Sequence, residues 1–221
     1  MVVETQSGRP EALNKARLAE AAHSVALFDK DLARILTDYG APPLWARRPG
    51  FVTLLRIILE QQVSLASADA MYQRLTDNIH PLTPRTVLAA GAPFLKSFGI
   101  TRQKATYFIN VAEAIQRGAL DLEATAEESD ESAVEQLTCV KGIGQWTAKI
   151  YLLMALRRPD VWPVGDVALA TAVKKLKGWQ ERPTQLELSE IAKAWRPYRA
   201  TAARMLWHYY LSEKANRELV N

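Results

Sequence analysis

Cysteine and histidine are scarce in this sequence, and their scarcity excludes several classes of site. The 221 residues include one cysteine, Cys139, and three histidines, His23, His80 and His208, which lie far apart without metal-ligand spacing. A single cysteine cannot form an intramolecular disulfide, and cysteine-ligated zinc sites and iron-sulfur clusters need several thiolates. We therefore expect no disulfide, no catalytic metal and no organic cofactor.

Long hydrophobic runs are also lacking. No apolar run approaches the length of about eighteen residues that a membrane-spanning helix needs. The opening MVVETQSGRP has no basic segment followed by an apolar one, as a secretory signal would have. With 48% hydrophobic residues, the chain can bury one substantial core or two small lobes. We expect a monomeric cytoplasmic protein without membrane contact, associated with the nucleoid if it is bacterial.

The net charge of +4 is small, but the charges are unevenly distributed. Residues 119–137 contain seven acidic and no basic residues, whereas residues 141–182 contain eight Lys or Arg and three acids. A basic region can bind a polyanion such as nucleic acid. The charge distribution alone favours a simpler interpretation, in which both regions are helix faces exposed to solvent. Only the sequence motifs can support binding to a polyanion.

Apolar residues recur at helical spacing along most of the chain, and no period-two strand pattern competes with them. In FVTLLRIILEQQ, an i, i+3, i+4, i+7 stripe begins at Phe51, and a second stripe begins at Leu65 with Ser64 as its predicted N-cap. The sequence therefore predicts an all-α protein. Helices are expected at about 11–28, 29–39, 51–62, 65–75, 103–117, 132–138, 145–157, 167–177, 186–194 and 198–213.

The predicted organisation is a disordered tail over 1–10 followed by one folded region over 11–221. The central helices, about 51–160, form one lobe, and the N-terminal helices together with about 161–221 form the second. The turn-rich GAPPLWARRPG stretch, residues 40–50, is the expected crossing between them.

Residues 137–156, LTCVKGIGQWTAKIYLLMAL, predict two helices joined by a tight glycine turn. Gly142 and Gly144 allow a sharp turn and a close approach of the backbone to a partner. The helix that follows offers unpaired N–H groups and the positive end of its dipole, which suits a phosphate. An ordinary helical hairpin with a glycine cap is the alternative, and Lys141 beside the turn favours phosphate only slightly.

The segment VWPVGDVALATAVKKLKG places Asp166 immediately before a helix that begins near Val167. A carboxylate there can cap the helix by accepting N–H bonds from its first turn. The same bonds keep the group ionised and hold it rigidly, which suits a carboxylate that faces a developing positive charge. Capping and catalysis are therefore compatible at Asp166.

Taken together, these segments resemble the helix-hairpin-helix DNA glycosylases with a Gly/Pro-rich loop and a catalytic aspartate, in particular the 3-methyladenine DNA glycosylase II type. The resemblance covers roughly residues 29–213. The matching blocks, in family order, are IILEQQVSLASA (57–68), FGITRQKATYFINVAEAI (98–115), LTCVKGIGQWTAKIYLLMAL (137–156), WPVGDVAL (162–169) and WRPYRATAARMLW (195–207).

The resemblance implies a two-lobed, all-α fold with the active-site cleft between the lobes. It implies double-stranded DNA with damaged bases as the partner, a hairpin that grips the DNA, and a damaged nucleotide flipped out of the duplex. It also implies that hairpin carbonyls, here those of Thr138, Val140 and Ile143, can hold a structural Na⁺ or K⁺.

Departures from the family pattern narrow the expected chemistry. Bifunctional relatives have a nucleophilic lysine two residues after the second hairpin glycine, where this chain has Trp146. The four cysteines of the iron-sulfur branch are missing. Gly165 stands where relatives often have a first acid, which leaves Asp166 as the catalytic carboxylate of this loop.

The resemblance also assigns the pocket and the DNA contacts. Trp146, Trp207 and, with less support, Tyr151 are expected to line the base pocket, where an indole face attracts a cationic base. The turn Gln61-Gln62-Val63-Ser64 resembles the loop that fills the gap left by the flipped nucleotide, with Gln62 as the expected wedge. Arg199 and Arg204 could hold either the DNA or the lobe interface. The hairpin residues assigned to DNA are Lys141, Gly142, Ile143, Gly144 and Thr147.

The sequence thus favours a monofunctional DNA glycosylase for 3-methyladenine and 7-methylguanine, with Asp166 stabilising an oxocarbenium-like transition state or orienting water. Two alternatives stay open at this point. One is a glycosylase for another lesion, such as hypoxanthine, uracil or an oxidised purine. The other is a DNA-binding module without catalysis, to which an acid beside DNA would bring no advantage.

Overall fold

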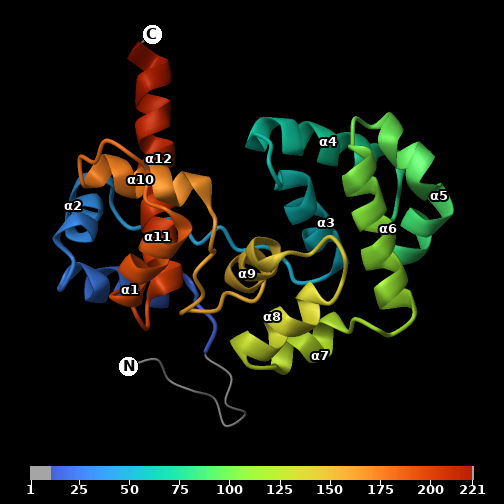
Figure 1. Cartoon of the computed structure of the whole chain (residues 1–221), viewed down its shortest axis with the longest axis horizontal. Helices are drawn as coiled ribbons and strands as arrows, with labels where there is room; N and C mark the ends of the chain where they lie inside the picture. The colour runs from blue at the N-terminus through green and yellow to red at the C-terminus, as the bar shows by residue number, and fades with distance from the viewer. Residues whose placement is uncertain (1–10, 221) are drawn as a thin grey trace. The chain divides into compact units, whose positions relative to one another are not determined.

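The computed structural model describes residues 11–220, and every regular element among them is an α-helix (Figure 1). This confirms the all-α fold that the helical spacing predicts. The tail over 1–10 that the sequence predicts to be disordered lies outside the described residues. The helices form two compact units. We call residues 11–46 and 157–220 the terminal unit and residues 47–156 the central unit.

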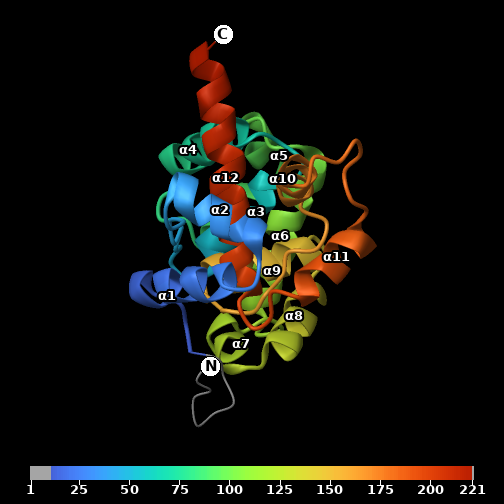
Figure 2. The same cartoon turned by 90° about the vertical axis from the view of Figure 1, so that its left-hand side faces the viewer.

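The terminal unit is built around its last helix. α12 (Arg199–Val220) contacts α1 (Lys15–Ala26), α2 (Lys30–Tyr39) and α10 (Val167–Leu176), as Figures 1 and 2 show. α11 (Gln185–Lys193) completes the unit. Although α12 is long, no helix in the described part of the chain is both long and apolar enough to cross a membrane. The apolar core of this unit includes Leu18, Val25, Leu32, Ile35, Leu169, Val173 and Leu206.

Polar side chains set where the helices of the terminal unit begin. Asn14 accepts a hydrogen bond from the Arg17 N–H and starts α1, four residues later than the helical spacing alone suggests. Asp29 caps α2 through two backbone N–H groups and also accepts from the indole N–H of Trp195. These caps satisfy N–H groups that would otherwise lack partners at each helix start.

The central unit is formed by the middle of the chain. α3 (Phe51–Glu60) is apolar along most of its length, and it contacts α4 (Leu65–Asn78), α6 (Arg102–Gln116) and α9 (Gln145–Met154). Leu54, Leu55 and Ile58, three positions of the predicted stripe, are fully buried. The helices of this unit are α3 (Phe51–Glu60), α4 (Leu65–Asn78), α5 (Pro84–Ser97), α6 (Arg102–Gln116), α7 (Leu122–Glu127), α8 (Asp130–Thr138) and α9 (Gln145–Met154).

Two helices of the central unit are missing from the sequence-based prediction. α5 contains Pro84 at its start and Gly91 and Pro93 inside, and Gly91 has a non-helical φ of 70° that kinks the helix. Such residues usually mark loops, so they hide the helical spacing on either side. α7 spans only six residues, too short for a periodic pattern to emerge.

Candidate active site

The segment between α8 and α9 forms the tight turn that its two glycines predict. Gly142 has a φ of 114°, and a Cβ added there would lie 2.4 Å from Cγ of Tyr107. A side chain at position 142 is therefore excluded both by the backbone conformation and by the packing of Tyr107. The fold alone therefore requires glycine at position 142, whether or not this turn binds a partner.

Gly144 has a different role. It is the N-cap of α9, with an ordinary φ of −86° and no side-chain cap for the helix. A Cβ added there would have no atom within 4 Å, and the residue is exposed. The fold therefore does not require glycine at this position, and open space lies in front of the first turn of a helix. This arrangement suits an anion such as a DNA phosphate.

Two side-chain amides hold the hairpin turn from inside the central unit. Asn110 Nδ2 donates to the Lys141 carbonyl at 3.0 Å. Gln61 Nε2 donates to the Gly142 carbonyl at 3.1 Å and to Thr147 Oγ1 at 2.8 Å. In a trans peptide the C=O and N–H point in opposite directions. The bond from Asn110 therefore turns the Gly142 N–H away from α6.

The turn between α3 and α4, residues 61–64, is the predicted wedge turn. Gln62 has a φ of 56°, a conformation that is uncommon for a residue other than glycine, and its side chain is exposed. Val63 is 38% exposed. Ser64 accepts a hydrogen bond from the Ser67 N–H, which confirms the predicted N-cap of α4. Gln62, Val63 and Ser64 are thus the exposed residues of this turn, whereas Gln61 is half-buried.

Three residues assigned to DNA from the sequence are directed inward instead. Both hydrogens of the Gln61 amide nitrogen are used by the hairpin, and Thr147 is only 1% exposed. The Ile143 side chain is buried. The structure does not support direct DNA contact by these three side chains, because the Gln61 amide N–H groups are bonded to the hairpin and the side chains of Ile143 and Thr147 are buried. Lys141 remains exposed beside the turn.

Asp166 is the N-cap of α10, as the sequence predicts. Its Oδ1 accepts from the Leu169 N–H at 2.9 Å and from the Trp207 indole N–H at 3.2 Å. The residue is 9% exposed. Gly165 before it has a φ of 84°, and a Cβ there would lie 3.2 Å from Gln185 Nε2. The backbone before Asp166 therefore disfavours the second acid that relatives often have at this loop.

The bond to Asp166 changes the interpretation of Trp207. The sequence places its indole face in the base pocket, but the ring is 8% exposed and its N–H is directed at the carboxylate. The edge-to-face contact with Trp45, at 6.4 Å between ring centroids, covers it further. Trp207 thus orients Asp166. Its ring does not expose a surface large enough for a base to stack on.

The two other predicted pocket residues differ in position. Tyr151 is fully buried within the central unit, where its hydroxyl accepts from the Gly50 N–H at 2.9 Å and burial raises the pKa of the phenol. The expectation that Tyr151 lines the pocket is therefore wrong, because no part of its ring is accessible. Trp146 is half-buried in the first turn of α9, two residues after Gly144.

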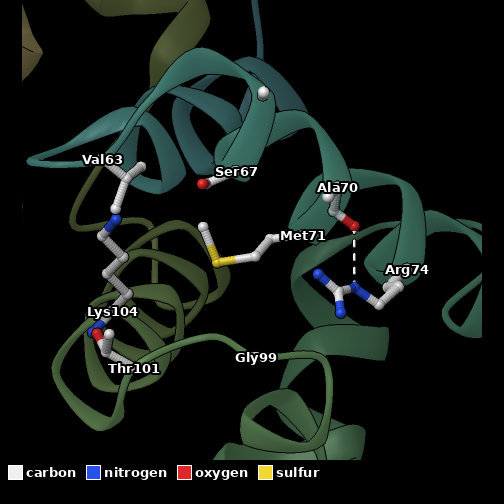
Figure 3. A pocket seen from close by; sticks show the side chains of 9 residues that line it. Val63, Ser67, Ala70, Met71, Arg74, Gly99, Thr101 and Lys104 are labelled. Carbon is white, nitrogen blue, oxygen red and sulfur yellow. Dashed lines mark hydrogen bonds between the residues drawn. The ribbon is translucent and has the colours of Figure 1, made fainter.

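A cavity of about 510 Å³ lies beside the wedge turn (Figure 3). The Lys104 ammonium donates to the Leu59 carbonyl at 2.7 Å near the end of α3, and burial lowers the pKa of this amine. Arg74 stands on α4, and its Nε donates to the Ala70 carbonyl. The cavity wall thus has two basic side chains and no acidic one. The lining residues are Val63, Ala66, Ser67, Ala70, Met71, Arg74, Gly99, Thr101 and Lys104.

Comparison with known proteins agrees with this geometry. Residues 55–197, more than half of the chain, match the HhH-GPD superfamily of base excision DNA repair proteins. The chain belongs to this superfamily. Figure 1 shows its helix-hairpin-helix as α8, the glycine turn and α9.

Relatives named for glycosylase activity are similar over most of the HhH-GPD chain. DNA-3-methyladenine glycosylase 1 of Schizosaccharomyces pombe is 26% identical over 182 residues, which cover 80% of each chain. The crystal structure of a DNA-3-methyladenine glycosidase from Bacillus halodurans has a TM-score of 0.72 and 30% identity, and covers 86% of this chain and 88% of that one. A 3-methyladenine DNA glycosylase of S. pombe in complex with abasic DNA has a TM-score of 0.79 at 24% identity, covering 85% of this chain and 95% of that one, and shows the fold alone.

Two arginines of this HhH-GPD chain, which the sequence could assign either to DNA or to the lobe interface, have partners within the terminal unit. Arg204 is fully buried and donates to the carbonyls of Leu44 and Ala200. Arg199 forms a two-point ion pair with Asp160 through Nε and Nη2, both at 2.9 Å. Both arginines therefore stabilise the terminal unit.

One aromatic residue near the HhH-GPD aspartate is missing from the sequence-based site. Trp45 is half-buried, has a φ of 46° and contacts Trp207, which in turn holds Asp166. The turn-rich composition around it indicates a connection and gives no sign of a partner more than a hundred residues away. An aromatic residue in a loop is the only signal that could have suggested it.

Proposed function

We propose that this protein is a DNA glycosylase that hydrolyses the N-glycosidic bond of alkylated bases such as 3-methyladenine and 7-methylguanine. The observation that carries the proposal is the double hydrogen bond on Asp166 from the Leu169 and Trp207 N–H groups. Such bonds hold a carboxylate in one orientation before the reaction begins, as electrostatic catalysis requires. The names of the relatives support the substrate class.

The proposed reaction needs a negative charge near the sugar. As the bond between C1′ and the base nitrogen breaks, the base leaves with the electron pair and the sugar becomes oxocarbenium-like. The oxygen of a water molecule then bonds to C1′, and its proton passes to solvent. Asp166 stabilises the sugar cation or orients this water, and its effect is greatest in the transition state, where the positive charge is largest.

Alkylation of a ring nitrogen makes the base a good leaving group. A 3-methyladenine or 7-methylguanine nucleoside carries a formal positive charge, so the base departs as a neutral molecule without a strong general acid. An indole face attracts a cationic ring. Trp146, half-buried at the start of α9, is the residue that we assign to stacking on the base.

The DNA is held through its backbone. We assign phosphate binding to the N–H groups at the open start of α9, beside Gly144 and Lys141. Gln62 and Val63, two exposed residues of the wedge turn, occupy the gap that the flipped nucleotide leaves. Filling this gap offsets part of the few kcal/mol that unstacking and unpairing cost.

We also propose that the enzyme does not cleave the strand. Strand cleavage in bifunctional relatives uses a lysine amine as nucleophile, and this chain has Trp146 at that position. No catalytic metal or organic cofactor takes part in the proposed chemistry. The monomeric state and the cytoplasmic location stay predictions.

A structural monovalent cation at the hairpin is part of the proposal. The carbonyls of Thr138, Val140 and Ile143 are its proposed ligands. The Val140 carbonyl also accepts from the Ile143 N–H at 3.0 Å, and a carbonyl oxygen has a second lone pair for a cation. The neighbouring carbonyls of Lys141 and Gly142 are directed to Asn110 and Gln61 and do not fit this role.

A panel of duplexes that each contain one defined lesion tests the function directly. We expect release of free base from 3-methyladenine and 7-methylguanine duplexes, and slower or no release from hypoxanthine, uracil or 8-oxoguanine duplexes. Base release limited to a neutral lesion would overturn the alkylated-base assignment. Binding to all duplexes without release from any would favour the non-catalytic module.

A further inference from the structure

One side chain connects the two elements that we assign to DNA. Gln61 stands at the first position of the wedge turn and donates to both the hairpin turn and the first turn of α9. We infer that Gln61 is a positioning residue that couples extrusion of the base by the wedge turn to the phosphate grip of the hairpin. This inference rests on the proposed function.

The geometry of the connection is well defined. Gln61 Nε2 has two hydrogens, and the Gly142 carbonyl and Thr147 Oγ1 receive one each. Because a carbonyl can only accept, the atom that faces it must be the amide nitrogen. Thr147 is almost fully buried. A hydrogen bond in such surroundings is less easily replaced by water than one at the surface.

The other side of the wedge turn is held as well. The buried Lys104 ammonium donates to the Leu59 carbonyl, two residues before Gln61, and Figure 3 shows its side chain extending from α6 toward Val63. A cation at this point also complements the dipole at the end of α3. The base of the turn is therefore fixed, whereas Gln62 projects outward.

This anchoring matters because extrusion needs a rigid wedge. The left-handed φ of Gln62 costs free energy and persists only where the surroundings maintain it. When the hairpin holds the phosphates, Gln61 fixes the distance between those phosphates and the wedge. Without it, the turn can retreat from the gap, and the flipped nucleotide loses part of its support. The chemical step at Asp166 does not depend on this connection.

The test compares two substrates and two variants in single-turnover base release. One duplex places 3-methyladenine opposite thymine, and the other places it opposite an abasic position, where flipping needs no base pair to be broken. We expect Gln61→Ala to slow release about tenfold or more on the paired duplex. On the unpaired duplex, release should stay within roughly twofold to threefold of the wild type, because less extrusion energy is needed there.

Asn110→Ala is the matched control. It also removes an amide that holds a hairpin carbonyl, but from α6 and without a link to the wedge turn. Its release rates relative to the wild type should be the same on both duplexes. Thr147→Val removes one of the two Gln61 partners and should show the Gln61 pattern with a smaller loss, which keeps the test available if Gln61→Ala does not fold.

Equal slowing of Gln61→Ala on the two duplexes, or no slowing on the paired one, would overturn the coupling. The coupling would also be overturned if Asn110→Ala and Gln61→Ala showed the same ratio of release rates on the paired and unpaired duplexes. Loosening of the hairpin alone would then explain the effect. Absence of base release by the wild type from either duplex would overturn the proposed function instead.

Discussion

Asp166 and Trp207 are 41 positions apart and share one hydrogen bond. The carboxylate supplies negative charge, while the indole N–H and the Leu169 N–H determine where that charge is directed. Charge and orientation can be removed separately by substitution.

We expect Asp166→Asn to lower base release by about a hundredfold or more, since it removes the charge that stabilises the sugar cation. Asparagine retains the shape of the side chain and caps helices well, so α10 should remain intact. Binding of lesion DNA should be unchanged or slightly tighter, because a carboxylate near phosphates is unfavourable before the reaction. Single-turnover base release and titration of labelled duplex measure the two effects. If a folded variant released the base at a rate within a few-fold of the wild type, Asp166 would act only as a helix cap.

Trp207→Phe removes the indole N–H and retains an aromatic ring. We expect base release to fall by about tenfold, corresponding to ~1.4 kcal/mol, and by the same factor for 3-methyladenine and for a neutral lesion. A loss confined to the cationic base would instead show that Trp207 recognises charge.

Trp162→Phe is the control for this substitution. Trp162 is buried against Trp195, and its indole N–H has no hydrogen-bond partner among the described residues. Removing that N–H should leave base release close to that of the wild type. An equal loss in both variants would attribute the Trp207 effect to packing.

At the scale of elements, the hairpin turn contains two glycines with separable roles. Gly144→Ala places a methyl group in open space at the start of α9. We expect its affinity for damaged and undamaged duplexes to fall equally, by roughly tenfold or ~1.4 kcal/mol, because phosphate contacts are independent of sequence. Its Tm should change little, because the added Cβ meets no atom within 4 Å and the poorer N-cap propensity of alanine is partly offset by its more restricted unfolded chain. Unchanged affinity would exclude the start of α9 from the DNA interface.

Gly142→Ala should behave in the opposite way. An alanine there would have an unfavourable φ, and its Cβ would overlap Tyr107. We expect a clear loss of Tm, with loss of DNA binding only as a consequence of local unfolding. Melting curves of the two variants test this difference: the fold needs glycine at position 142, whereas DNA binding needs it at position 144.

At the scale of the whole molecule, the reaction should end at an abasic site. Because Trp146 replaces the nucleophilic lysine of bifunctional relatives, the product strand should stay intact until it is treated with heat or alkali. Gel electrophoresis before and after such treatment measures this. Borohydride trapping of a covalent protein-DNA adduct by the wild type would contradict the prediction.

The local features of this protein follow from residues that are close in the sequence. Helical spacing predicts most of the helices, and the Pro/Gly-rich approach to a helix predicts Asp166 as an N-cap. Ser64 and the glycine turn are predicted equally well. These features depend on residues within one or two turns of each other, so their physical cause is contained in the local sequence. Family resemblance then assigned the chemistry to Asp166.

The directions of the other side chains depend on packing between segments that are far apart in the sequence. Gln61 was assigned to DNA but bonds to residues more than eighty positions away, and Tyr151 and Arg204 are enclosed by packing. The resemblance places Trp207 in the base pocket, yet its indole N–H donates to Asp166. Burial and long-range hydrogen bonds arise when distant segments pack together. The pattern around each residue in the sequence does not contain this information.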